Sequence, residues 1–179
     1  VSLRKTNQEV KKVIPLLLAK YYYGSHKEKV INDSPPKHTF HMIIDEAHNI
    51  LSMQSNRESE SWKDYRLELF EEIIKEGRKF GFYLTLSSQR PADISATIMS
   101  QIHNFFIHRL VNDRDLLLLD NSISTLDSLS RSMIPNLSKG CAVITGTSFD
   151  LPMVVQFKRL AKKHQPDSGD VNLSELWSD

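Results

Sequence analysis

Hydrophobic positions along the chain follow helical spacing in some segments and form short runs in others, which predicts alternating helices and strands. Apolar residues three and four positions apart predict amphipathic helices over residues 7–23 and 62–79. Gly24 is predicted to end the first helix, and Pro15 can kink it because proline removes a hydrogen-bond donor. The polar segment 24–38, which contains a double proline, is predicted to be a loop.

Short apolar runs rich in β-branched and aromatic residues predict strands, and further helices are expected between them. The predicted strands cover residues 40–45, 82–87, 104–110, 140–146 and 153–160. The predicted shorter helices begin at Pro91, run from Asp113 to Leu119 with Asn112 as the N-cap, and cover residues 125–133.

This order of elements predicts an α/β fold with a mostly parallel sheet flanked by helices. The last two strands, joined by "TSFDLP", are expected to form an antiparallel hairpin. Residues 1–160 are expected to form one domain. Residues 161–179 are polar and are expected to be an extended C-terminal tail, with Leu176 and Trp177 as a candidate docking tip.

Composition and charge narrow the class of protein without identifying it. The chain has 179 residues with 40% hydrophobic and 25% charged residues, as expected for a soluble globular domain. The net charge of +1 gives no global basic field for nucleic acid, and the excess of cations in residues 1–40 is best explained as a solvated face. The single cysteine, Cys141, excludes an internal disulfide and fits a reducing cytoplasm. The longest apolar run, Val13–Ala19, is too short to span a bilayer, so no membrane association is expected.

Two carboxylates, Asp45 and Glu46, follow the predicted strand in "HTFHMIIDEAHNIL". Side chains at the carboxyl end of a parallel strand point into the crevice where ligands bind. An aspartate there can hold a hydrated magnesium ion, and a neighbouring glutamate can orient and polarise an attacking water. The alternative is a strand that leads into a helix cap, where acidic residues are common.

Gln89 lies 43 positions after Glu46 and follows the next predicted strand. Adjacent parallel strands would place the two side chains at the same sheet edge. An amide there can hydrogen-bond both a γ-phosphate oxygen and the attacking water, although a loop glutamine is the simpler alternative. Arg78 ends the second long helix, and its guanidinium could neutralise phosphates bound by a neighbouring subunit. The alternative role for Arg78 is a cation that favours the helix C-terminus.

Two other patterns are weaker. His41, Asp45 and His48 could suggest a zinc cluster, but only His41 and Asp45 share a face of the strand, and His48 lies beyond the turn. Ser87 and Ser88 could suggest a hydrolase, but the sequence contains no G-x-S-x-G motif.

The sequence also lacks the phosphate loop that a nucleotide hydrolase of this type needs. That loop has the form G-x-x-x-x-G-K-[ST], because backbone amides and a lysine surround the phosphates. Gly140 and Gly146 are six positions apart, and Thr147 stands where the lysine is required. The chain starts at Val1 without a methionine, and we expect the natural N-terminus to lie upstream.

Several segments together resemble the C-terminal half of HerA-type ATPases, which are hexameric DNA-translocating motors of the HerA/FtsK branch of the RecA-like P-loop proteins. The resemblance covers about residues 7–160, and its most specific part is 71–115. It is carried by "HMIIDEAHNIL", "EGRKFGFYLTLSSQRPADISATIMSQIHNFFIHRLVNDRD" and "IPNLSKGCAVITGTSFDLPMVVQF". The resemblance implies a RecA-like P-loop core whose N-terminal half, with the phosphate loop and the strand and helix around it, is missing from these residues.

The resemblance also implies roles for the candidate residues. Asp45 would serve magnesium, Glu46 would be the catalytic base, Gln89 the sensor, and Arg78 the finger that reaches a neighbouring subunit. Rival arginines for the finger are Arg66, Arg90 and Arg109. The implied cofactors are ATP and Mg²⁺, and the implied partners are double-stranded DNA, further copies in a homo-hexamer, and a nuclease or other effector protein.

Two other classes of protein are alternatives to a DNA translocase. A DEAH-box helicase is rejected because the letters "DEAH" at 45–48 are not followed by that family's other motifs. A non-catalytic remnant or docking module, which associates with an intact ATPase or a partner protein, stays open because the phosphate loop is absent. The serine-rich segment 52–64, with Arg57 and Lys63, is either a pore loop or an ordinary surface loop.

Overall fold

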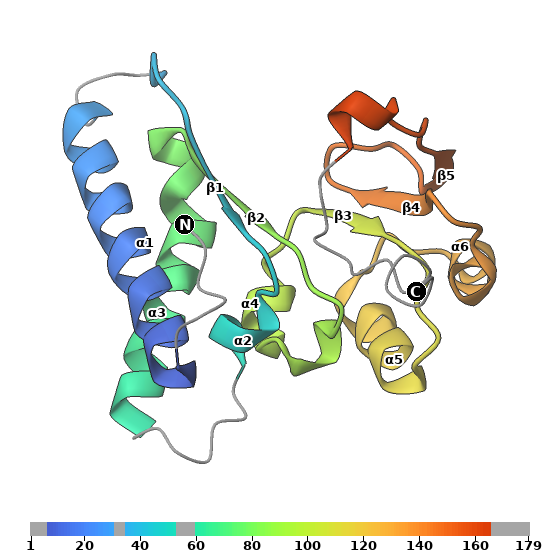
Figure 1. Ribbon diagram of the computed structural model, residues 1–179, viewed down its shortest axis with the longest axis horizontal. Coiled ribbons are helices and arrows are strands. Elements are labelled where there is room, and N and C mark those ends of the chain that lie inside the picture. The colour runs from blue at the N-terminus through green and yellow to red at the C-terminus, as the bar shows by residue number, and fades with distance from the viewer. Residues whose placement is uncertain (1–6, 31–34, 53–59, 166–179) are drawn as a thin grey trace, which may run out of the picture.

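Two small β-sheets form the frame of the fold in the computed structural model, which describes residues 7–30, 35–52 and 60–165 (Figure 1). One sheet pairs two strands in parallel, and the other contains three antiparallel strands in the order β3-β4-β5. The strands are β1 (Phe40–Ile44), β2 (Phe82–Leu86), β3 (Asn104–Ile107), β4 (Cys141–Gly146) and β5 (Met153–Gln156).

The α/β class and the antiparallel hairpin of β4 and β5 are confirmed, but the prediction of a mostly parallel sheet is wrong for the described residues. Only β1 and β2 run in parallel. Alternation of helices and strands predicts parallel pairing when consecutive strands become neighbours. Here β2 and β3 are consecutive in the chain but do not pair, and β3 pairs with β4 instead.

Two long helices, α1 (Gln8–Val30) and α3 (Glu60–Glu76), lie against the parallel pair on the left of Figure 1. The predicted end of α1 at Gly24 is wrong, because the helix continues to Val30. The buried stripe explains the continuation. Its members recur three and four positions apart on both sides of Gly24, and they are Leu16, Ala19, Tyr23, His26 and Val30. Burial of this stripe outweighs the weak helix propensity of one glycine.

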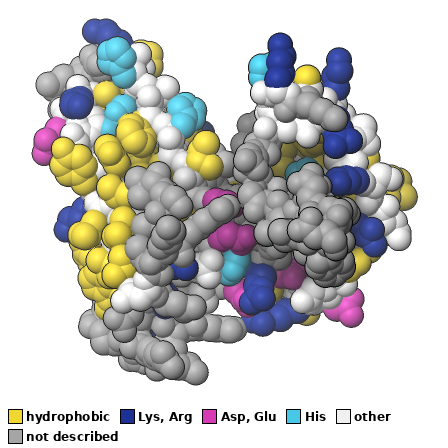
Figure 2. All heavy atoms as spheres, viewed as in Figure 1, with side chains coloured by type: hydrophobic (Ala, Val, Ile, Leu, Met, Phe, Trp, Pro, Cys, Tyr) yellow, Lys and Arg dark blue, Asp and Glu magenta, His cyan; other side chains and the backbone are white. Residues whose placement is uncertain are grey.

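The outer face of α1 keeps several apolar side chains in solvent, visible as the hydrophobic cluster on the left of Figure 2. Leu17, Tyr21 and Tyr22 belong to this exposed face. The inner faces are closely packed, and Phe70 of α3 and Ile98 are 0% exposed. Phe40 and Phe82 stack across the parallel pair, with 4.9 Å between ring centroids. Tyr23 of α1 packs edge-on against Phe82, with 5.3 Å between ring centroids, and so attaches α1 to the strands that carry the candidate site.

The remaining helical segments are short. They are α2 (His48–Leu51), α4 (Ala96–Met99), α5 (Asp113–Ser122), α6 (Ser128–Met133), η1 (Gly77–Phe80), η2 (Pro91–Asp93), η3 (Ile134–Asn136) and η4 (Lys162–His164). The predicted cap of α5 is confirmed, because Asn112 Oδ1 accepts the Arg114 backbone N–H at 2.9 Å. The helix predicted from Pro91 is divided into η2 and α4.

The helix predicted over 125–133 begins later, at Ser128, because Asp127 caps it through the Ser130 backbone N–H at 2.8 Å. That hydrogen bond also lowers the pKa of Asp127. The strand predicted over 104–110 ends at Ile107.

Parts of two predictions lie outside the described residues. Most of the predicted tail 161–179, including Leu176 and Trp177, lies outside the described residues. In the described part of the tail, η4 forms a helical turn where extended chain was predicted. Arg57 in the predicted loop also lies outside, whereas Lys63 belongs to α3. Among the described residues, every helix is too short or too polar to cross a lipid bilayer.

Gly24 and Gly77 provide a matched pair of predictions about stability. A Cβ atom at Gly24 would meet nothing within 4 Å, so Gly24→Ala in the middle of α1 should raise the free energy of unfolding by about 1 kcal/mol. A Cβ atom at Gly77 would lie 2.5 Å from the Phe82 carbonyl oxygen, so Gly77→Ala should lower that free energy. Urea denaturation of both variants measures the two effects, and a destabilising Gly24→Ala would contradict the continuous helix.

Candidate active site at the ends of the parallel strands

The loops that follow β1 and β2 continue the parallel pairing beyond the strands themselves. The Ser87 backbone N–H donates to the Ile44 carbonyl at 2.9 Å, and the Ala47 N–H donates to the Ser87 carbonyl at 2.8 Å. These two hydrogen bonds hold the segment after β1 against the segment after β2. The candidate residues of both segments therefore meet at one edge of the sheet.

Glu46 and Gln89 are in direct contact at this edge. The Gln89 Nε2 amide donates to Glu46 Oε1 at 2.7 Å. The proximity predicted from adjacent parallel strands is thus confirmed, whereas the catalytic roles of the two residues stay predictions. The contact holds one carboxylate oxygen of Glu46, Oε1, and does not involve the other, Oε2.

Glu46 adopts an unusual backbone conformation. Its φ of +50° lies in the left-handed region, and it is the one described residue other than glycine with a positive φ. This conformation costs a residue with a Cβ roughly 1–2 kcal/mol. Hydrogen bonds on both sides hold it: Asp45 Oδ1 accepts the Glu46 N–H at 3.0 Å, and the Glu46 carbonyl accepts the Asn49 N–H at 2.9 Å. Strained backbone of this kind is concentrated at functional sites.

His48 lies beside the second carboxylate oxygen of Glu46. Its Nδ1 is 3.3 Å from Glu46 Oε2 and 3.0 Å from Ser88 Oγ. Ser88 Oγ also accepts the Arg90 backbone N–H at 3.0 Å, so the Ser88 hydroxyl hydrogen can point to His48. Glu46 Oε2 is buried and makes no hydrogen bond within the described part of the protein. Apart from the neighbouring His48 ring, this carboxylate oxygen is therefore an acceptor available to a water or ligand.

His48 was not expected at this site, whereas the structure places its ring beside Glu46. The signal was present, because His48 and Ser88 lie just beyond the ends of the two strands that carry Glu46 and Gln89. Among residues 7–30, 35–52 and 60–165, no group of three or more His, Cys, Asp or Glu side chains is placed to hold a metal ion.

Asp45 fits a role in holding a hydrated magnesium ion. Its side chain is exposed at the sheet edge, and only Oδ1 is hydrogen-bonded within the described residues, to the Glu46 N–H. A single exposed carboxylate suits Mg²⁺, which keeps several waters and takes few protein ligands. Asp45, Glu46 and Gln89 are therefore the candidate residues that the fold brings together.

Arg78 lies elsewhere. It belongs to η1, before the first residue of β2, whereas Gln89 follows the last. The five residues of β2 separate the two by roughly 16 Å at the usual rise of a strand. Arg78 is exposed and lines the groove beside β2. It does not reach the Glu46 site of its own chain, so the two roles that stay open are one towards another subunit and that of a cation at the helix C-terminus.

The rival arginines differ in their surroundings. Arg66 is 0% exposed and donates to the Ser52 carbonyl at 3.2 Å, which leaves it unsuited to reach another subunit. Arg90 is exposed and directly follows Gln89, and Arg109 is exposed after β3.

A parallel strand pair that ends in Asp-Glu, with an amide beside the glutamate and helices on its flank, matches part of the fold of P-loop ATPases. Structural comparison shows the extent of this match. VirB4 of Thermoanaerobacter pseudethanolicus superposes with a TM-score of 0.67 over 91% of this chain and 41% of VirB4, at 12% identity. The genome-packaging NTPase B204 of Sulfolobus turreted icosahedral virus 2, in complex with AMPPCP, superposes with a TM-score of 0.58 over 80% of this chain and 62% of B204, at 16% identity.

Sequence comparison identifies the family more closely. The chain is 32% identical over 157 residues to the DNA double-strand break repair helicase HerA of Sulfolobus acidocaldarius, and 34% identical over 139 residues to that of Sulfurisphaera tokodaii. These matches cover 86% and 76% of this chain but only 29% and 26% of the relatives. No protein-family model matches the chain. Most of the chain is thus homologous to part of the HerA-type helicases.

The strain at Glu46 leads to a prediction about stability. Both Glu46→Gly and Glu46→Ala remove the contact with Gln89, but only glycine adopts the left-handed conformation without penalty. Glu46→Gly should therefore unfold with a free energy about 1 kcal/mol higher than Glu46→Ala. Urea denaturation of the two variants measures the difference, and equal stabilities would mean that residue 46 is not held in the left-handed region.

Proposed function

We propose that this chain carries the water-activating half of the active site of an ATP-driven, ring-forming DNA translocase. The observation that carries the proposal is the 2.7 Å contact between Gln89 and Glu46 at the carboxyl ends of two parallel strands. Two comparisons support the proposal. The chain is homologous to helicases named for DNA double-strand break repair, and it shares part of its fold with a packaging NTPase in complex with AMPPCP.

The arrangement around Glu46 suits activation of a water molecule. Gln89 holds Oε1, so the carboxylate cannot rotate freely, and the buried Oε2 is the oxygen that can accept a hydrogen bond from water. In this proposal Glu46 Oε2 orients the water and accepts its proton as the water attacks the γ-phosphate. His48, 3.3 Å from Oε2, limits the directions from which that water can approach.

The nucleotide itself requires residues outside this sequence. ATP would enter with Mg²⁺, which neutralises charge on the phosphates, and Asp45 would bind the ion through its water shell. The phosphate loop is absent from residues 1–179, so the amides and lysine that surround the phosphates would come from another part of the protein.

Assembly into a homo-hexamer would give Arg78 a target. It lies at the end of β2 opposite to Gln89, so the phosphates that it could neutralise are those of a neighbouring subunit. Double-stranded DNA would be held at its phosphates by a few cations, and Figure 2 shows several Lys and Arg side chains at its upper right. Exposed candidates that follow β5 are Lys158, Arg159 and Lys163. We also expect a cytoplasmic location and a nuclease or other effector as partner.

The second candidate is a non-catalytic module that docks on an intact ATPase or on another partner. The absence of the phosphate loop favours it. The two candidates differ in what the DNA immediately upstream of the Val1 codon encodes: a G-x-x-x-x-G-K-[ST] motif supports the translocase, and a start codon supports the module.

Substitution of Glu46 by glutamine tests the catalytic assignment in a protein that carries these residues together with a phosphate loop. Glutamine can still accept the Gln89 hydrogen bond but cannot take a proton from water. ATP hydrolysis should fall at least about a hundredfold, whereas ATP affinity should be retained. Glu68→Gln, at an exposed position of α3, is the matched control and should leave turnover unchanged. Undiminished turnover in Glu46→Gln would refute the assignment.

A second prediction concerns the chain by itself. Because residues 1–179 contain no phosphate loop, they should bind ATP only weakly in titration calorimetry, with or without Mg²⁺. Restoring the missing segment should produce tight binding. Tight binding by residues 1–179 alone would show that the site has been misidentified.

A further inference from the structure

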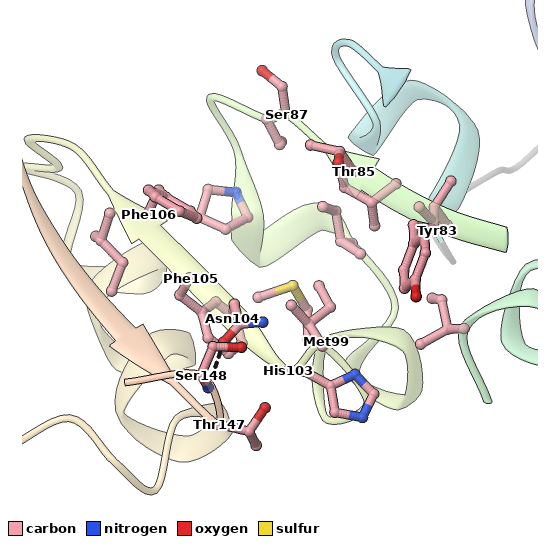
Figure 3. A pocket seen from close by; sticks show the side chains of 18 of the residues that line it. Tyr83, Thr85, Ser87, Met99, His103, Asn104, Phe105, Phe106, Thr147 and Ser148 are labelled. Atoms are coloured by element: carbon pink, nitrogen blue, oxygen red, sulfur yellow. Dashed lines mark hydrogen bonds between the residues drawn. The ribbon is translucent and has the colours of Figure 1, made fainter. Parts of the chain in front are cut away.

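The loop that carries Gln89 connects β2 to α4 and covers residues 87–95. It starts beside a groove of about 820 Å³ that lies between β2 and β3, and Ser87, Ser88 and Pro91 contribute to the lining of this groove (Figure 3). Because β2 and β3 do not pair within the described residues, no strand pairing holds the loop on the groove side. The direction of the Gln89 side chain therefore depends on the contacts that the loop makes with other elements.

Both ends of the loop are hydrogen-bonded to the segment that runs from the end of β1 through α2. At the near end, Ser87 pairs with Ile44 and Ala47. At the far end, the Ser95 N–H donates to the Leu51 carbonyl at 2.9 Å. The middle of the loop, which contains the candidate sensor, lies between these two fixed points.

Asp115 of α5 holds the middle of the loop. Its Oδ1 accepts the Ala92 backbone N–H at 2.9 Å, although the two residues are 23 positions apart in the chain. Ala92 lies three positions after Gln89. An acidic residue in the first turn of a helix commonly stabilises its own helix through the helix dipole. The hydrogen bond of Asp115 leaves the helix and reaches another segment, so this carboxylate also serves the loop.

Burial distinguishes Asp115 from the other contact between the same two segments. Asp115 is 5% exposed, and burial of a carboxylate costs free energy unless hydrogen bonds compensate for it. A bond from a backbone N–H to a carboxylate is stronger than one between neutral groups. Arg114 Nη1 lies 3.4 Å from Asp93 Oδ1, but the Arg114 side chain is 58% exposed, and solvent weakens such an ion pair. Asp115 is therefore the residue through which α5 fixes the loop.

The chain between Ala92 and Gln89 is short and restrained. Pro91 is buried, and its ring fixes the backbone φ at that position. A displacement of Ala92 therefore also moves Gln89, whose amide lies 2.7 Å from Glu46 Oε1. Misplacement of a catalytic group by about 1 Å can lower a reaction rate about a hundredfold.

We propose that Asp115 is a positioning residue: from the first turn of α5, it holds the loop after β2 so that Gln89 reaches Glu46. Asp115 acts through the Ala92 backbone and takes no part in the chemical step. Its effect on ATP hydrolysis rests on the proposed function, whereas its effect on the Gln89 side chain exists without nucleotide. The helix that follows β3 thus sets the orientation of an amide that follows β2.

Nuclear magnetic resonance of residues 1–179 tests the placement of Gln89 without nucleotide. A hydrogen bond to a carboxylate moves the side-chain amide proton of Gln89 downfield, and Gln89→Ala identifies that resonance. Asp115→Ala should shift the resonance to the position of an unbonded glutamine amide. Asp115→Asn keeps an acceptor for the Ala92 N–H and should leave the resonance in place. An unchanged resonance in folded Asp115→Ala would overturn the proposal.

Turnover by a protein that carries these residues together with a phosphate loop gives the second measurement. Asp115→Ala should lower kcat at least about tenfold and change the KM for ATP less than about threefold, because the loop that binds the phosphates lies outside residues 1–179. Asp115→Asn should keep kcat within about threefold of that of the unchanged protein. Failure of asparagine to retain kcat would overturn the proposal.

Asp127→Ala is the matched control for a loss of stability. It removes a carboxylate that accepts the Ser130 backbone N–H at 2.8 Å at the start of α6, so it also weakens a helix start. Because Asp127 does not contact the loop after β2 in any described hydrogen bond, kcat should be retained. An equal loss of kcat in Asp127→Ala and Asp115→Ala would reduce Asp115 to a structural role and overturn the proposal.

The two measurements separate this inference from the proposed function. If Glu46→Gln retains turnover, the proposed function fails, and the Gln89 resonance still decides the role of Asp115. If Glu46→Gln is inactive while Asp115→Ala keeps its kcat, this inference alone is overturned. If Asp115→Ala does not fold, hydrogen exchange of the unchanged protein decides. The Ala92 N–H should exchange at least about tenfold more slowly than an unbonded amide, and fast exchange would overturn the proposal.

Discussion

Parallel pairing of β1 with β2 is the constraint on which the candidate site depends. The pairing continues beyond both strands, through the hydrogen bonds of Ser87 with Ile44 and Ala47, and so brings Glu46 to Gln89. The stacked rings of Phe40 and Phe82 help to define the register from the opposite end of the strands. A shift by one residue would turn each side chain to the other face of the sheet. The distance between two polar groups at one edge is thus set by the register of the two strands.

At the end of this strand pair, Glu46 has a conformation that does not favour the stability of the folded protein. Its backbone is left-handed, and its Oε2 is buried without a hydrogen bond in the described part of the protein. Each feature would be removed by a small change of residue, and neither contributes to the core. Local strain with an unpaired acceptor is expected where a side chain must stay ready for a ligand or water. The well-packed strands and helices around it can tolerate a penalty of roughly 1–2 kcal/mol.

Sequence reasoning succeeded where local pattern and topology decide the structure, and failed where packing between distant segments does. The ends of β1 and β2 follow from short apolar runs, and the meeting of Glu46 with Gln89 follows from parallel neighbours. The passage of α1 through Gly24 depends on the partners of its buried stripe. The contact of His48 with Glu46 depends on a turn geometry that residue types do not reveal. The separation of β2 from β3 also escaped prediction, because an α/β pattern does not indicate which consecutive strands pair.

The absent phosphate loop and the groove between the sheets are two separate gaps, one in the sequence and one in the structure. A phosphate loop normally follows a β-strand and leads into a helix. A strand that lay in the groove parallel to β2 would end beside Ser87 and Ser88, because the lining of the groove reaches both residues. A loop after that strand would then emerge next to Gln89 and Glu46, which are in contact with each other. A strand in that position would therefore bring such a loop to the sheet edge that carries Glu46 and Gln89.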